Sequence, residues 1–197
     1  MKILIVGGGG REHAIAWKLS KENNVEKIYC APGNAGIAKV AQCVNISDSD
    51  IENLVKFAKE NNIDLTVVGP EVPLVNGIVD EFEKKGLKIF GPNKECSTFE
   101  GSKAFSKDFM IRHNIPTAKY KEYTNLDEAI SEIDSFGYPV VIKADGLAAG
   151  KGVVIPENIE DAINTLREIM SDKKFGSAGE KIVVEEIDKL VELVKAV

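Results

Sequence analysis

The stretch KILIVGGGGREHAIAWKLSKEN (residues 2–23) decides the fold class, because four glycines join a short apolar run to a helical pattern. Ile3–Val6 is continuously apolar, as expected of a strand that is buried on both faces of a sheet. After the glycines, Ala14, Trp17 and Leu19 follow a helical spacing. A buried strand, a tight turn and a helix together predict the first part of a β–α–β unit with parallel strands.

The same alternation continues to about residue 91. Further strands are predicted at 27–31, 43–46, 63–69 and 87–91, and helices at 49–62 and 75–86. The first of these helices carries its apolar residues in one stripe, and Gly86 ends the second. We therefore expect an open parallel sheet with helices on both faces, a Rossmann-like α/β architecture with right-handed crossovers.

A smaller α+β unit is predicted after a helical stretch from Cys96 to His113, which ends before Pro116 because the residue preceding a proline avoids helical geometry. Its strands are expected at 118–124, 138–144, 152–155 and 181–186, and its helices at 125–137 and 157–170. The predicted domains are thus 1–114, which includes the linker helix, and 115–186. Residues 187–197 carry an apolar stripe that predicts a helical tail.

Composition excludes several classes of function. The 197 residues carry 25 basic and 31 acidic side chains, a net charge of −6, which argues against a nucleic-acid-binding protein. No apolar run is as long as the roughly 20 residues of a membrane span, so we expect a cytoplasmic protein without a membrane partner. The three cysteines contain no C-x-x-C pair, which predicts neither a disulfide framework nor a zinc site.

The glycine turn at Gly7–Gly10 opens a helix N-terminus, where free backbone N–H groups and the helix dipole favour phosphate. The dinucleotide fingerprint is not met, because its third glycine would fall at Glu12. Two loops, APGNAG (31–36) and GPEVPLVNG (69–77), also follow the carboxyl ends of strands, where open α/β sheets bind ligands. Asn34 and Glu71 offer polar groups there, although each loop could equally be an ordinary turn.

The segment KADGLAAGKGVVI (143–155) predicts a flap over nucleotide phosphates. Lys143 ends a buried strand, where an ammonium group is costly unless it meets an anion or reaches water. Phosphate oxygens would provide that anion, and the glycines allow the backbone to approach them. The segment is not a P-loop, because a strand follows it where a P-loop would begin a helix.

Three further side chains could complete a nucleotide site. Lys103 lies on the predicted helix after Cys96, and Glu185 with Glu186 ends the last strand, where carboxylates could hold an amino group. Each has a structural alternative: Lys103 as a solvated lysine, and the two glutamates as charges at a sheet edge.

In order along the chain, GGGGREHA, APGNAG, DLTVVGPEVPLVNGIVD, EGSKAFSKDFM, VVIKADGLAAGKGV and KIVVEE resemble the amino-terminal half of the glycinamide ribonucleotide synthetase family, ATP-grasp ligases of purine biosynthesis. The resemblance implies that phosphoribosylamine is held by Gly8, Gly9, Gly10, Arg11, Glu12, Gly33, Asn34, Gly69, Pro70, Glu71 and Leu74. It implies that ATP is held by Lys103, Lys143, Asp145, Gly146, Gly150, Lys151, Gly152, Glu185, Glu186 and Ile187.

In this family ATP phosphorylates the carboxylate of glycine, and the amine of phosphoribosylamine then displaces phosphate. The products are glycinamide ribonucleotide, ADP and phosphate. Magnesium or manganese would accompany ATP, but the sequence departs from the family after VVEE, so we expect no metal ligands in this chain and assign no catalytic residue. We therefore expect a truncated chain that does not complete ligation alone and whose exposed core favours self-association. The alternatives are a phosphosugar- or ATP-binding module without turnover, and a fragment of another ATP-grasp ligase.

Overall fold

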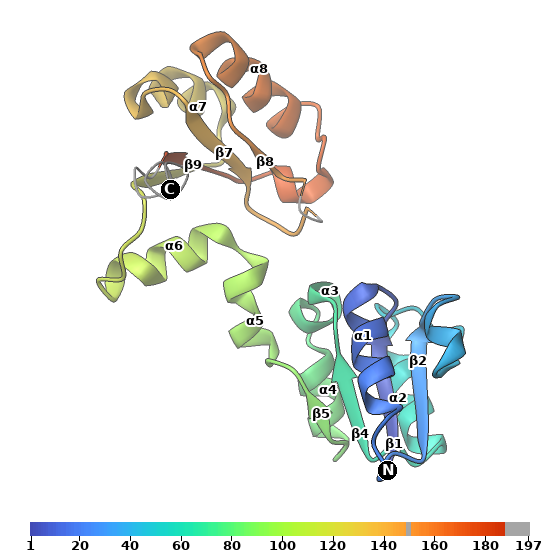
Figure 1. The fold of residues 1–197 in the computed structure, drawn as a ribbon. Helices are drawn as coiled ribbons and strands as arrows, with labels where there is room; N and C mark the ends of the chain where they lie inside the picture. Colours follow the sequence, from blue (N-terminus) through green and yellow to red (C-terminus); the bar gives the residue numbers. More distant parts are fainter. Residues whose placement is uncertain (149–150, 188–197) are drawn as a thin grey trace, which may run out of the picture. The chain divides into compact units, whose positions relative to one another are not determined.

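Strand β1 (Lys2–Gly7) is the central strand of a five-stranded parallel sheet in the order β3-β2-β1-β4-β5 (Figure 1). Its other strands are β2 (Lys27–Pro32), β3 (Gln42–Cys43), β4 (Leu65–Val68) and β5 (Ile89–Phe90). This computed structural model describes residues 1–148 and 151–187. The chain divides into two compact units, with the division between Ser97 and Thr98.

Helices cover both faces of the first sheet. They are α1 (Gly10–Leu19), α2 (Ile51–Glu60), α3 (Glu71–Val75) and α4 (Ile78–Lys84). Leu4 and Val6 pack with α2 and α4 on one face, whereas Ile3 and Ile5 pack with α1 on the other. This two-sided burial is why the strand is apolar at every position, and it confirms the predicted parallel α/β architecture.

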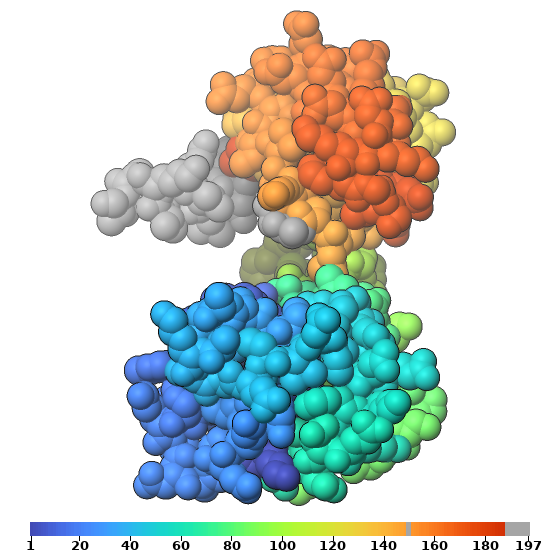
Figure 2. All heavy atoms as spheres, turned by 90° about the vertical axis from the view of Figure 1, so that its right-hand side faces the viewer, coloured from blue at the N-terminus to red at the C-terminus, as the bar shows by residue number. Residues whose placement is uncertain are grey.

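The second unit is built on an antiparallel sheet in the order β6-β9-β7-β8, which confirms the predicted α+β class. Its elements are α6 (Lys103–Arg112), β6 (Tyr120–Tyr123), α7 (Leu126–Glu132), β7 (Val140–Ala144), β8 (Val153–Val154), α8 (Ile159–Met170) and β9 (Ile182–Glu186). One face of the sheet packs through Ile142 and Val184 on α7 and α8. Figure 2 shows this unit from the side on which α8 lies, in orange to red.

Two predicted helices differ from those in the structure. The helix expected over 75–86 begins only at Ile78, after Gly77, whose φ of +87° lies in the left-handed region that favours glycine. Helix α3 instead lies within the segment 69–77, which was predicted to be a loop. The helix expected over 96–113 is divided into α5 (Lys94–Gly101) and α6 by Ser102, which has extended backbone. The Ser102 hydroxyl accepts a hydrogen bond from Phe105 N at 3.1 Å and so caps α6. Strand β3 is also shorter than expected, since it ends at Cys43.

The division between the units lies before α6, whereas the predicted domain boundary lay after it, between Asn114 and Ile115. Helix α6 belongs to the second unit because Lys107 reaches Glu185 of β9 and Ala104 N donates to Asp145. These partners are far apart in sequence, so local patterns do not reveal them. The predicted tail lies outside the described residues except for Ile187.

Within the described ranges, every helix is too short or too polar to cross a membrane.

Candidate functional site

The loops predicted to bind a sugar phosphate meet at the carboxyl edge of the parallel sheet. Gly33 N donates to Gly7 O at 3.1 Å, and Asn34 Nδ2 donates to Gly8 O at 2.8 Å. An added Cβ on Gly8 would lie 2.6 Å from Gly33 O, closer than non-bonded atoms approach. The turn after β1 and the loop after β2 therefore form one connected surface, and Gly8 must be glycine for them to touch.

Asn34 organises this loop. Its Oδ1 accepts hydrogen bonds from Gly36 N at 2.8 Å and Ile37 N at 2.9 Å, while its Nδ2 donates to Gly8 O. Both ends of the side-chain amide are thus engaged within the protein. Asn34, which was predicted to bind the substrate, thus shapes the loop through its side-chain amide.

Glu12 supports the glycine turn from inside. The residue is only 3% exposed, and its Oε2 accepts a hydrogen bond from Gly9 N at 2.6 Å. Its Oε1 is buried and lacks a hydrogen-bond donor among the described residues. An added Cβ on Gly69 would lie 2.0 Å from this oxygen. Gly69 is therefore glycine because the carboxylate of Glu12 occupies the space that a side chain would need.

Charged groups stand on the outer side of the same edge. Arg11 Nη1 lies 2.8 Å from Glu71 Oε1, which joins the start of α1 to the start of α3. The hydrogen bond from Arg11 lowers the pKa of the Glu71 carboxyl group. Gly9 and Gly10 are exposed next to Arg11 in sequence. This edge thus presents backbone amides and a guanidinium group, which are the donors that bind phosphate.

The remaining predicted residues of the first unit differ in environment. Pro70 precedes α3 as its N-cap, with extended backbone. Leu74 packs against the apolar cluster of Leu4, Val6 and Phe82, so its side chain contributes to the core. An added Cβ on Gly91 would lie 2.8 Å from Leu74 Cδ2, which shows how closely that region is packed.

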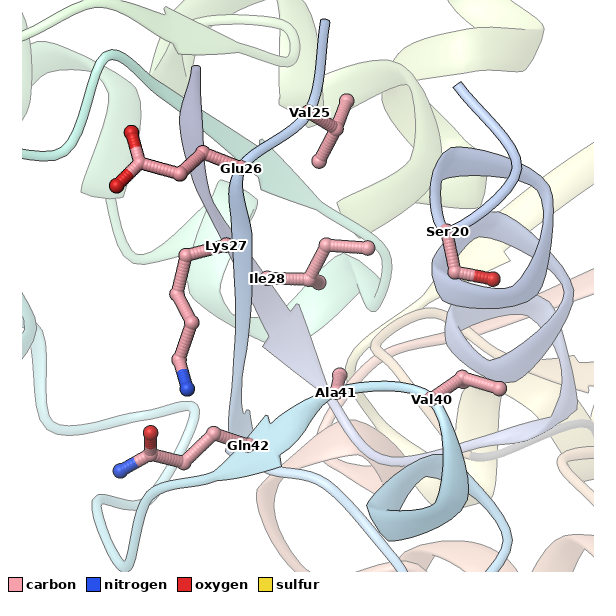
Figure 3. Close-up of a pocket in the computed structure, with 8 residues that line it drawn as sticks. All are labelled: Ser20, Val25, Glu26, Lys27, Ile28, Val40, Ala41 and Gln42. Atoms are coloured by element: carbon pink, nitrogen blue, oxygen red, sulfur yellow. The ribbon is translucent and has the colours of Figure 1, made fainter. Parts of the chain in front are cut away.

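A hollow of about 490 Å³ lies at the opposite end of the strands, around the amino ends of β2 and β3 (Figure 3). It is lined by Ser20, Val25, Glu26, Lys27, Ile28, Val40, Ala41 and Gln42. None of these residues was predicted to bind a ligand. Its charges are one lysine and one glutamate, whereas the glycine edge combines backbone amides with Arg11, so the glycine edge is the better phosphate site.

In the second unit, three charged side chains meet on the sheet face opposite α7 and α8. Lys143 and Glu185 were predicted to bind ATP, whereas Lys107 was not. Glu185 of β9 is paired in register with Val141, so its side chain lies on the same face as that of Lys143 on β7. Lys143 Nζ lies 2.7 Å from Glu185 Oε1, and Lys107 Nζ of α6 lies 2.9 Å from Glu185 Oε2. Glu185 is 5% exposed, so this is a buried carboxylate with two ammonium counter-ions.

Glu185 Oε1 is sealed from solvent and lies 2.7 Å from the ammonium group of Lys143, so an ion pair covers it. A carboxylate oxygen has two lone pairs, and Oε1 therefore keeps the capacity to accept a hydrogen bond from a further N–H group beside this lysine. This geometry supports the predicted contact of Glu185 with an amino group.

Asp145 and Lys103 connect the end of β7 to α6. Asp145 accepts hydrogen bonds from Ala104 N at 2.7 Å and from the Ser102 hydroxyl at 3.0 Å, so its carboxylate caps α6. Lys103 Nζ donates to Gly146 O at 3.1 Å. Burial lowers the pKa of Lys103, because desolvation disfavours its charged form. Lys103 interacts electrostatically with both Asp145 and Lys143.

The glycines of the predicted flap are required by close packing at two described positions. An added Cβ would lie 2.9 Å from Ala178 Cβ at Gly146 and 2.6 Å from Ala148 Cβ at Gly152. Lys151 is exposed, whereas Gly150 lies outside the described residues.

The last two residues predicted to bind ATP are Glu186, which ends β9, and Ile187, which follows it. Glu186 lies on the other face of β9 from Glu185 and forms an ion pair with Lys119 at 3.4 Å. Ile187, immediately after the strand, is half-buried.

Lys107 was missed by sequence reasoning. It lies four residues after Lys103 on α6, so both lysines share one face of the helix. That spacing was visible in EGSKAFSKDF, but the partner Glu185 is 78 positions away and only the folded chain brings them together.

Comparisons with known proteins identify the family of both units. Residues 1–100 match the family model described as phosphoribosylglycinamide synthetase, N domain, and residues 101–194 match the ATP-grasp (A) domain model of the same synthetase. The phosphoribosylamine–glycine ligase of Clostridium acetobutylicum is 55% identical over 186 residues, which cover 94% of this chain and 45% of that protein. The ligase of Caldanaerobacter subterraneus is 56% identical over 187 residues, which cover 95% and 45%.

Solved structures show the same fold. Phosphoribosylamine–glycine ligase from Thermotoga maritima matches with a TM-score of 0.77 and 31% identity, over 95% of this chain and 44% of that one. The biotin carboxylase domain of Hydrogenobacter thermophilus 2-oxoglutarate carboxylase matches with a TM-score of 0.75 at 22% identity, over 93% and 43%, which shows a shared fold alone. The chain therefore spans less than half of the length of these relatives.

Proposed function

Because the chain belongs to the phosphoribosylglycinamide synthetase family, we propose that it supplies the sugar-phosphate and ATP-binding parts of a phosphoribosylamine–glycine ligase. The observation that carries this proposal is the buried Glu185, whose two carboxylate oxygens each lie within 3 Å of a lysine ammonium group. The family match also favours this ligase over the other ATP-grasp ligases.

In the first unit, the glycine edge binds the phosphate and ribose of phosphoribosylamine. The exposed Gly9 and Gly10 amides at the start of α1 and the Arg11 guanidinium group bind the anion. Glu12 and Asn34 hold these groups in place through hydrogen bonds with Gly9 N and Gly8 O, and Gly69 leaves room for the Glu12 carboxylate. Arg11 leaves Glu71 in part when it meets phosphate, which costs little because the Arg11 side chain is 65% exposed.

In the second unit, ATP lies along the sheet face that carries Lys143 and Glu185. Glu185 Oε1 accepts a hydrogen bond from the amino group of adenine, and Lys143 and Lys103 bind phosphate oxygens. Lys151, on the exposed side of the flap, is positioned in sequence to join them. The backbone after Glu186, around Ile187, meets the ring nitrogens of the base.

The proposed reaction transfers the terminal phosphoryl group of ATP to the carboxylate of glycine, and the amine of phosphoribosylamine then displaces phosphate. Lysines contribute by positioning ATP and by neutralising charge on its phosphates. Magnesium supplies further neutralisation when it is bound with ATP. Among residues 1–148 and 151–187, no group of three or more His, Cys, Asp or Glu side chains could hold a metal ion, so we assign no step to a metal ligand of this chain.

Calorimetric titration of the chain with ribose 5-phosphate and, separately, with magnesium-ATP tests this proposal. Each ligand should bind, Arg11→Met should weaken only the sugar phosphate, and Lys143→Met should weaken only ATP. Lys27→Met, in the hollow of Figure 3, is the matched control and should change neither affinity. Flat titrations with both ligands would overturn the proposal.

A binding module without turnover remains the second candidate, since the described residues present phosphate donors without a group of metal ligands. An assay for glycinamide ribonucleotide with ATP, glycine and phosphoribosylamine separates the two. Product from this chain supports the ligase, whereas binding without product supports the module.

A further inference from the structure

Glu185 has more positive partners than its single charge requires. Lys107 and Lys143 each lie within 3 Å of a different carboxylate oxygen, at 2.9 Å and 2.7 Å. Two ammonium groups around one buried carboxylate leave a local excess of one positive charge. Such an arrangement is unfavourable unless an anion shares the site or one of the lysines has another role.

The two lysines are held differently. Lys107 Nζ also donates to the Thr117 hydroxyl at 2.7 Å and lies 5.8 Å from the centre of the Tyr120 ring, and its side chain is 12% exposed. The side chain of Lys143 is 25% exposed, and its ion-pair partner within the described residues is Glu185. Lys107 is therefore the fixed counter-ion, and Lys143 is the one that can move.

We propose that Lys107 is a positioning residue: it keeps Glu185 paired so that the ammonium group of Lys143 can leave for a phosphate when nucleotide binds. This inference rests on the proposed ATP site. The Lys143 ammonium group lies against Oε1, which is sealed from solvent. When Lys143 leaves, Lys107 stays on Oε2, so the buried carboxylate keeps a counter-ion.

Without Lys107, the same movement would leave a buried carboxylate with no counter-ion. Removing one partner of a buried pair is strongly unfavourable, because the remaining charge keeps its desolvation cost. Lys143 would then stay on Glu185, and the phosphates of a nucleotide would gain little from it. Lys107 thus decides how much of the affinity comes from phosphate, although it need not touch the nucleotide.

The test compares ATP with adenosine, which has the same base and no phosphate. For each variant we take the ratio of the dissociation constant of adenosine to that of ATP. In Lys107→Met this ratio should fall about tenfold or more, as expected when a buried charge loses its partner. Lys107→Arg keeps the charge and should hold the ratio within about threefold of wild type.

The same substitution in a Glu185→Gln background separates this role from a merely structural one. Glutamine retains an oxygen acceptor and carries no charge, so there is nothing for Lys107 to neutralise. Lys107→Met should then change the ratio by less than about threefold. A tenfold fall in that background as well would overturn the inference, as would an unchanged ratio in Lys107→Met alone.

A ligand-free experiment tests the shared pairing directly. Amide hydrogen exchange of Val184 on β9 measures the opening equilibrium in Lys107→Met, Lys143→Met and the double variant. Because either lysine alone still neutralises Glu185, the double variant should open at least about tenfold more than the product of the single effects. In Glu185→Gln this excess should vanish. Effects that simply multiply would overturn the inference.

The two experiments distinguish the failure of each proposal. If the wild-type chain binds neither ATP nor adenosine, the proposed nucleotide site is rejected, and the proposed release of Lys143 is rejected with it. The hydrogen-exchange result then decides alone whether Lys107 is a second counter-ion. If ATP binds and Lys107→Met leaves the ratio unchanged, the nucleotide site stands and only the role of Lys107 is rejected.

Discussion

Replacing Gly69 by alanine tests whether Glu12 holds the glycine turn in place. The added Cβ would lie 2.0 Å from Glu12 Oε1, 2.5 Å from Cδ and 2.6 Å from Cγ. Glu12 is buried, and moving it away would break the hydrogen bond that its Oε2 accepts from Gly9 N. The substitution therefore forces either a shift of the backbone around Gly69 or the loss of the contact that shapes the turn.

The expected cost follows from these two effects. Overpacking a closely packed site costs about 1–3 kcal/mol, and losing a hydrogen bond to a charged group costs about 1.5–3 kcal/mol. Because the structure relaxes partly, the first unit should lose roughly 2–5 kcal/mol of its free energy of unfolding. Gly10→Ala is the matched control: nothing lies within 4 Å of its added Cβ. Since Gly10 is the first residue of α1, this change should gain about 0.4–1 kcal/mol.

Urea unfolding followed by tryptophan fluorescence provides the assay. Trp17 is the only tryptophan of the chain and lies in α1, so its signal follows the first unit even if the two units unfold separately. In a Glu12→Ala background, Gly69→Ala should cost less than about 1 kcal/mol, because the clashing carboxylate is gone. A cost below about 0.5 kcal/mol in wild type, or the same cost in both backgrounds, would refute the reasoning.

Three further outcomes are expected. Because Arg11 lowers the pKa of Glu71, this pair stabilises the first unit above the ordinary carboxyl pKa of 4.5, and this stabilisation is lost as pH falls through the folded pKa. Arg11→Met should raise the pKa of Glu71, as carbon-13 NMR would show. Asp145→Ala removes a cap of α6, so it should cost about 1–2 kcal/mol of the free energy of unfolding and speed hydrogen exchange in the first turn of that helix. The control, Asp108→Ala, removes only an exposed ion pair with Arg112 and should do neither. Cys43 is exposed and should be alkylated by iodoacetamide in the native state, whereas burial raises the pKa of Cys30 to about 12, so Cys30 should react only after unfolding, as peptide mass spectrometry would show.

Elements that depend on local residues were predicted well. The apolar run Ile3–Val6 and its glycine turn predicted a parallel sheet. The helix predicted from residue 125 begins there, because Asn125 caps α7 by accepting a hydrogen bond from Glu128 N at 3.0 Å. Gly86 also ends α4 in the left-handed conformation that was expected, with φ of +71°. These features were accessible because the cause and the effect lie within a few residues of each other.

Gly77 and Ser102 show where a local signal was present but was outweighed. The apolar spacing continues through both positions, so periodicity alone predicted a helix over 75–86 and another over 96–113. Glycine and serine were the contrary signal, because in the folded chain α4 begins after Gly77 and Ser102 separates α5 from α6. The division between the units lies inside α5, between Ser97 and Thr98, and α6 belongs to the second unit because Asp145 and Glu185 tie it to β7 and β9.

The sequence by itself determined the order of strands and helices, the fold class and the positions of the phosphate-favouring turns, because periodicity, glycine and helix caps act between near neighbours. The tertiary structure alone decided which side chains share a site. Glu12 against Gly69, and Lys107 with Lys143 around Glu185, are partners 57, 78 and 42 positions apart, brought together by sheet register and helix packing. Burial then makes their charges matter, because a carboxylate removed from water depends on the few partners that the fold places beside it.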